Sequence, residues 1–249
     1  MSRHLIHYSA AFLCAASPAL LIGLNFAGPV YSGPMQVQLS PTAPLEIRVS
    51  NDTVSLLVGI MGIERDLYLG KLFVDEGMTS PEGSHFTHPR QEDFARIKDG
   101  LAKAGAPDLE PLLIALEEAN GKKAVADAFY DVLGGLKKAE SALKPTDQDI
   151  RTALLQTVEV AASNLDPSGT TEAVAYQEAW GLLMAASSHL GALSTSSDPA
   201  VRKMATKLVM KFDEVVITAP IPNTNAPIAF DPAPVTQLIE TLKGDAGSI

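Results

Sequence analysis

The sequence contains little cysteine, few aromatic residues and an excess of acidic over basic side chains. Its 249 residues include one cysteine, Cys14, which excludes a disulfide scaffold, a cysteine-based zinc site and an iron–sulfur cluster. Nineteen lysines and arginines stand against 29 aspartates and glutamates, so the formal net charge is −10. This balance argues against a nucleic-acid partner, because binding to phosphates depends on Lys and Arg.

Several catalytic motifs are also missing from the chain. It contains no Gly-x-Ser-x-Gly, Gly-x-Gly-x-x-Gly, His-Glu-x-x-His or Cys-x-x-Cys-His. Hydrolase, dinucleotide-binding, zinc-protease and c-type haem functions therefore have no support from motifs. We rank an enzyme below a non-catalytic protein for this reason.

The sequence at the N-terminus predicts export. A short basic start at Arg3 is followed by apolar residues 10–22, which is typical of a secretory signal. Pro18 and Asn25 interrupt the apolar run, so a continuous membrane span of about 20 residues is not available. We predict a signal peptide over residues 1–28, a periplasmic or secreted protein, and no stable membrane span after cleavage. The alternative is an N-terminal membrane anchor.

Residues 29–50 carry four prolines and are expected to form an extended arm, because proline is excluded from helix interiors. Alternation within 45–49 would also suit a short strand. Residues 219–249 are expected to form a second irregular segment, rich in Pro and Asn, with a short helix near 235–243.

Between these segments, residues 51–218 have the apolar spacing of helices joined by short turns. The fold class predicted is all-α, a single helical bundle of about seven helices. The first helix is expected over 52–76, capped by Asn51 or Asp52. Apolar positions predict the others around 94–101, 109–116, 125–143, 150–161, 176–190 and 201–215.

One loop carries the strongest candidate for chemistry. His85 and His88 lie three residues apart, just before Pro89, and Glu92 follows about one helical turn later. Pro89 suits the first position of a helix, so we expect His88 at its N-cap with an extended backbone. Two imidazoles and a carboxylate could hold a divalent transition metal.

The first helix adds a second carboxylate to this candidate site. Gly59, Gly62, Asp66 and Gly70 share one narrow stripe, whereas Glu64 points away from it. Glycine costs a helix interior roughly 1 kcal/mol relative to alanine, so three of them indicate close approach by a neighbouring helix or a bound group. A carboxylate buried in that stripe needs a partner, and the His85–His88 loop could supply one. The candidate metal ligands are therefore Asp66, His85, His88 and Glu92.

A ligand-free explanation of the same residues stays open. A histidine at a cap can bond to free backbone amides, Phe86 can anchor the loop to the core, and Asp66 can pair with a histidine without any ion. Under this alternative the chain is a structural or partner-binding module.

The segment 66–101 also resembles an uncharacterised family of secreted α-helical proteobacterial proteins. The similarity rests on Leu-x-x-Gly at 67–70, Gly77, His-Phe-x-His-Pro at 85–89 and the acidic residue Glu92. In that family a histidine often stands where this chain has Asp66. The resemblance implies an exported helical protein and supplies no activity.

Overall fold

The first helix, α1, is apolar on all sides, and the other helices pack around it. A computed structural model describes residues 52–78 and 85–244, so the predicted signal peptide and arm lie outside the described residues. All described residues belong to one structural unit, which spans residues 44–249. The elements in chain order are α1 (Thr53–Glu76), η1 (Pro89–Phe94), α2 (Ala95–Lys103), α3 (Glu110–Glu118), α4 (Lys122–Leu143), α5 (Asp147–Ser163), β1 (Thr170–Thr171), α6 (Ala173–Ser188), α7 (Leu190–Ser194), α8 (Pro199–Thr218), β2 (Ile228–Ala229) and α9 (Ala233–Gly244).

The all-α prediction is confirmed, and the helix ends follow from local signals in the sequence. Asp52 caps α1 by accepting a hydrogen bond from the Ser55 backbone N–H, and Gly77 ends it in the left-handed conformation. Thr146 and Asp149 form a reciprocal capping box at the start of α5. Within the described residues, no helix is both long and apolar enough to cross a membrane.

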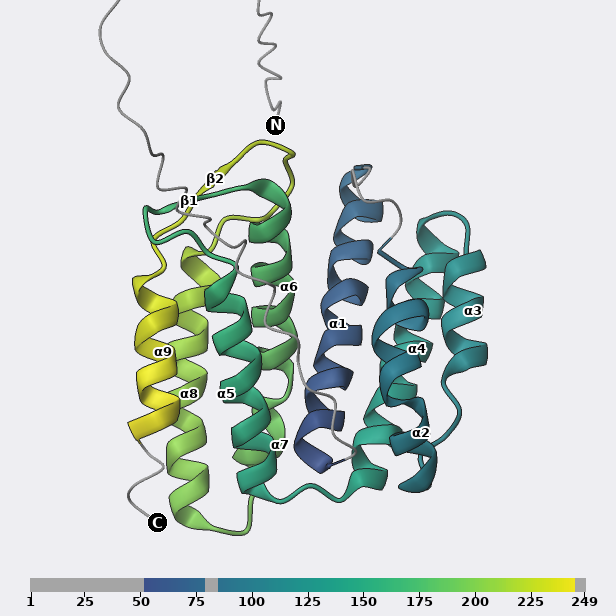
Figure 1. Ribbon diagram of the computed structural model, residues 1–249, viewed down its shortest axis with the longest axis horizontal. Helices are drawn as coiled ribbons and strands as arrows, with labels where there is room; N and C mark the ends of the chain where they lie inside the picture. Colours follow the sequence, from purple (N-terminus) through teal and green to yellow (C-terminus); the bar gives the residue numbers. More distant parts are fainter. Residues whose placement is uncertain (1–51, 79–84, 245–249) are drawn as a thin grey trace, which may run out of the picture. The chain divides into compact units, whose positions relative to one another are not determined.

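Helix α1 lies between α5–α9 on one side and α2–α4 on the other (Figure 1). It separates two hydrophobic cores. One, which we call the C-terminal core, joins Leu57, Val58 and Met61 of α1 to α5, α6, α7, α8 and α9. The other, the N-terminal core, joins Leu56, Ile60, Ile63 and Leu67 of α1 to η1, α2, α3 and α4. Because both sides of α1 are covered by protein, the charged residues in its middle are buried or partly buried.

The segment between α8 and α9 is packed against the bundle, although its Pro and Asn content predicted only an irregular linker. Thr170 and Thr171 pair antiparallel with Ala229 and Ile228. Ile228 and Phe230 are buried in the C-terminal core, and the Tyr176 hydroxyl donates a hydrogen bond to the Pro220 carbonyl. A strand of two residues has no periodicity, so the sequence pattern could not predict it.

Candidate metal site

Three consecutive residues of α1, Glu64, Arg65 and Asp66, place charge between the two cores. Asp66 is 0% exposed and Glu64 7%, and the Arg65 side chain is 18% exposed. Successive residues of a helix point about 100° apart, so the three side chains leave α1 in different directions. A buried charge is tolerated only when it is paired, and each of the three has partners.

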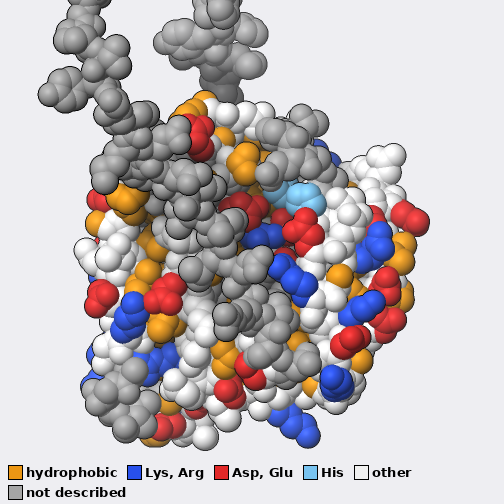
Figure 2. Space-filling model, in the orientation of Figure 1, with side chains coloured by type: hydrophobic (Ala, Val, Ile, Leu, Met, Phe, Trp, Pro, Cys, Tyr) orange, Lys and Arg blue, Asp and Glu red, His pale blue; other side chains and the backbone are white. Residues whose placement is uncertain are grey.

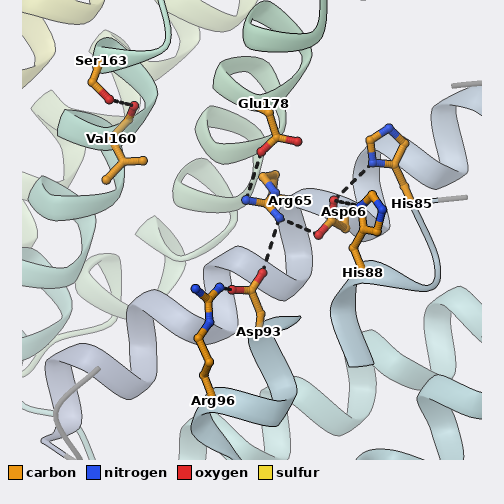
Figure 3. Close-up of polar contacts among 9 residues, drawn as sticks. All are labelled: Arg65, Asp66, His85, His88, Asp93, Arg96, Val160, Ser163 and Glu178. Atoms are coloured by element: carbon orange, nitrogen blue, oxygen red, sulfur yellow. Dashed lines mark hydrogen bonds and ion pairs between the residues drawn. The ribbon is translucent and has the colours of Figure 1, made fainter. Parts of the chain in front are cut away.

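Asp66 reaches the two histidines, as the sequence predicted (Figure 3). Its Oδ1 lies 3.2 Å from His85 Nδ1 and 3.9 Å from His88 Nδ1. Its other oxygen, Oδ2, accepts a hydrogen bond of 2.7 Å from Arg65 Nη2. Burial alone would raise the pKa of Asp66, but the hydrogen bond with His85 and the Arg65 charge outweigh it and lower that pKa. Asp66 is therefore ionised at neutral pH.

His85 is buried in the turn that leads into η1, with 3% of its surface exposed. Its ring packs edge-on against Phe73 and His88, with centroids 5.0 Å and 5.7 Å away. Its Nε2 is buried, and among the described residues no group bonds to it. The ring is thus held in place by packing and by a single hydrogen bond on the Asp66 side.

His88 has a helical backbone, so the prediction of an extended residue before Pro89 was wrong. Its φ and ψ are −59° and −46°, and its side chain makes no capping hydrogen bond. Proline disfavours this conformation in the preceding residue, but here the Gln91 N–H bonds back to the Thr87 carbonyl and includes His88 in a helical turn. The side chain is 23% exposed. Because it does not cap the helix, its ring can face Asp66.

One donor atom from each of Asp66, His85 and His88 lies within 4.8 Å of the others. Ligands of a tetrahedral ion with bonds of about 2.0–2.1 Å stand roughly 3.3–3.5 Å apart. The two distances from Asp66 to the imidazole nitrogens, 3.2 Å and 3.9 Å, bracket that spacing. In Figure 2, histidine atoms reach the visible face of the molecule beside acidic and basic side chains.

Glu92 lies outside this group, although the sequence predicted it as a ligand. It is exposed, whereas its neighbour Asp93 is 4% exposed and faces α1. The cause is that Pro89–Phe94 is a π-helix. Hydrogen bonds in a π-helix run from i to i+5, so the wider turn brings the fifth residue after His88 round towards α1. Glu92, one α-helical turn after His88, points to solvent instead.

Asp93 belongs to an ion-pair network centred on Arg65 (Figure 3). Arg65 Nη2 lies 3.4 Å from Asp93 Oδ2, and Arg65 Nη1 lies 3.0 Å from Glu178 Oε2 on α6. Arg96 pairs with the other Asp93 oxygen. Burial raises the pKa of Asp93, and the charges of Arg65 and Arg96 offset only part of that effect.

The glycine stripe of α1 is explained by close packing of neighbouring side chains. A Cβ on Gly59 would overlap Ile97, and one on Gly70 would overlap the ring of Phe86. A Cβ on Gly62 would lie 2.9 Å from the Asp93 carboxyl group. The expected close approach is confirmed, and its partners are residues of the loop, η1 and α2.

A second cluster, which the sequence analysis missed, joins Glu64 to His189 and Glu140. His189 Nε2 lies 2.8 Å from Glu64 Oε2, and its Nδ1 lies 3.3 Å from Glu140 Oε1. Burial would lower the pKa of His189, but the two carboxylates outweigh it and raise that pKa to about 10. The available signal was the apolar character of α1 on all sides, which predicts that Glu64 is buried too.

No protein-family model, curated protein or solved structure matches the chain. The resemblance to the secreted proteobacterial family therefore stays a prediction. What the site can do has to be derived from its own residues.

Proposed function

We propose that this protein is an exported helical-bundle protein that binds one divalent transition-metal ion through Asp66, His85 and His88, without catalytic activity. The observation that carries the proposal is the convergence of three donor atoms within 4.8 Å, one of them on a carboxylate that is 0% exposed. Two imidazoles favour zinc, copper, nickel or cobalt over magnesium and calcium, which prefer oxygen ligands.

The charge around the site also favours a cation. The single charge of Arg65 is shared by the carboxylates of Asp66, Asp93 and Glu178. Arg96 at the rim supplies one further positive charge. Asp66 therefore shares the Arg65 guanidinium with two other carboxylates, and a metal ion bound to Asp66 would add positive charge beside it.

The competing function is a structural or partner-binding module that holds no ligand. It has a specific observation in its favour, because Phe86 is buried in the N-terminal core and the bond between His85 and Asp66 already ties this turn to α1. Under this alternative, replacing the histidines would change the stability of the protein and no binding property.

Calorimetric titration with Zn²⁺ separates the two functions, using full-length protein purified without an immobilised-metal column. We expect one Zn²⁺ per chain, and binding weakened by at least about 100-fold in the His85→Ala/His88→Ala variant, which lacks two of three ligands. Glu92→Gln is the matched control, and its affinity should equal that of the unmodified protein. A folded protein that does not bind Zn²⁺, or a double variant that binds it equally well, would contradict the proposal.

Thermal unfolding gives a second readout of the same proposal. A ligand that binds only the folded state adds about 2.7 kcal/mol of stability at a free concentration of 100 Kd. Zn²⁺ should therefore raise the unfolding temperature of the unmodified protein and of Glu92→Gln, and leave the double variant unchanged.

Export is the part of the proposal that rests on the sequence alone. The basic and then apolar N-terminus supports it. Expression of the full chain in a secreting bacterium, followed by intact mass measurement, should find a product that has lost about the first 28 residues and lies in the periplasmic fraction. A full-length product retained in the membrane fraction would favour the anchored alternative.

A further inference from the structure

Arg65 is held from three sides by carboxylates that belong to three different elements. One of these is Asp66, its neighbour on α1, at 2.7 Å. The others are Asp93 of η1, at 3.4 Å, and Glu178 of α6, at 3.0 Å. The stem of Arg65 also packs directly on α6, because a Cβ on Gly181 would lie 2.8 Å from Arg65 Cγ. The guanidinium group is thus fixed by contacts with η1 and with α6.

The two oxygens of Asp66 consequently have different partners. Oδ2 is bonded to Arg65, and Oδ1 is the atom that faces the imidazoles of His85 and His88. A carboxylate held at one oxygen cannot rotate freely about its terminal bond. The Arg65 bond occupies one lone pair of Oδ2 and places positive charge beside it, which favours contact of an ion with Oδ1.

We propose that Arg65 is a positioning residue of the metal site: by holding Oδ2 of Asp66 it presents Oδ1 alone, so that the ion is bound by one carboxylate oxygen and two imidazole nitrogens. This inference rests on the function proposed above. It implies discrimination against Ca²⁺, which takes six to eight oxygen ligands and often a bidentate carboxylate. Groups that orient a ligand in this way typically change metal affinity by about 10–100-fold.

Two variants test the role of Arg65 by different means. Arg65→Lys keeps the charge but replaces the rigid planar guanidinium group by a flexible ammonium, which does not fix the direction of the bond to Asp66 Oδ2. Arg65→Met/Asp93→Asn removes one positive and one negative charge together, which limits the unpaired charge left inside. We expect Zn²⁺ affinity to fall by about 10-fold in the first and by up to about 100-fold in the second. We also expect the visible spectrum of bound Co²⁺ to change in both, which a loss of stability alone would not cause.

Arg90→Met is the matched control, because Arg90 lies on η1 like Asp93 but its side chain pairs with Glu117 of α3. Its Zn²⁺ affinity and Co²⁺ spectrum should match those of the unmodified protein. Unchanged affinity and spectrum in both Arg65 variants would overturn this inference while leaving the proposed function intact. Failure of the unmodified protein to bind Zn²⁺ would overturn both.

Discussion

Buried histidines pack against two faces of α1, in one cluster with Asp66 and in another with Glu64. The two clusters differ in the number of carboxylates that contact each imidazole ring. His189 has a carboxylate at each ring nitrogen, Glu64 at 2.8 Å and Glu140 at 3.3 Å. His85 has a carboxylate at one nitrogen, and the other is buried without a partner among the described residues. His88 faces the same carboxylate oxygen as His85.

This difference is why we propose the Asp66 cluster, and not the His189 cluster, as the metal site. An imidazole bonded to carboxylates at both nitrogens is a protonated cation and has no lone pair to offer an ion. At the other cluster, His85 and His88 face one carboxylate, that of Asp66, which is also paired with Arg65.

The largest expected effect is on stability, at His189. Replacing it by glutamine leaves Glu64 and Glu140 without their cation, and breaking such a buried pair typically costs roughly 3–5 kcal/mol. Denaturant unfolding of His189→Gln measures this cost. Because Glu64 pairs with His189 and Asp66 with His85, Zn²⁺ affinity should stay within about twofold. A variant of unchanged stability, or one that loses Zn²⁺ binding while folded, would remove the distinction between the clusters.

A smaller effect is expected from filling the glycine stripe beside the proposed metal site. Gly70→Ala places a methyl group against Phe86, next to His85, and overpacking of this kind costs about 1–3 kcal/mol. It should also weaken Zn²⁺ binding, since the ring of Phe86 and the adjacent His85 must shift. Gly134→Ala is the matched control: it lies on an exposed position of α4 with nothing within 4 Å. Denaturant unfolding should show it unchanged or stabilised by up to about 1 kcal/mol.

An effect of similar size is a pH dependence that we assign to His189. Its pKa is about 10 when folded and about 6.5 in an unfolded chain. The folded state therefore binds the proton more tightly. The contribution of His189 to the free energy of unfolding is complete below pH 6.5 and is lost as the pH rises towards 10. The advantage in unfolding free energy of the unmodified protein over His189→Gln should shrink from pH 7 to 9, by at most about 1.4 kcal/mol per pH unit. An advantage that stays constant over this range would show that His189 is not held as a cation.

Much of the fold could be predicted because its helices carry their own signals. Apolar spacing located α4, α5 and α8, and Asp52 and Thr146 capped the helices they precede. The break at His189, which separates α6 from the short α7, has no proline or glycine at that position to announce it. Local pattern therefore predicts where helices lie better than where a helix is interrupted.

The site was predicted in part, and the misses have one physical cause each. Asp66, His85 and His88 converge because a glycine-lined helix face draws its neighbour close. Glu92 was chosen by assuming 3.6 residues per turn, whereas the π-helix brings Asp93 to α1 instead. The Glu64 cluster was missed because its partners are far away in sequence, and spacing along the chain contains no information about them.

The central claim is that Asp66, His85 and His88 form one metal site, and a crystal grown with Zn²⁺ tests it most directly. Anomalous diffraction at the zinc edge should place a single strong peak about 2.0–2.2 Å from Asp66 Oδ1 and from one nitrogen of each ring. No peak among these three side chains, or a peak held by other residues, would contradict the account.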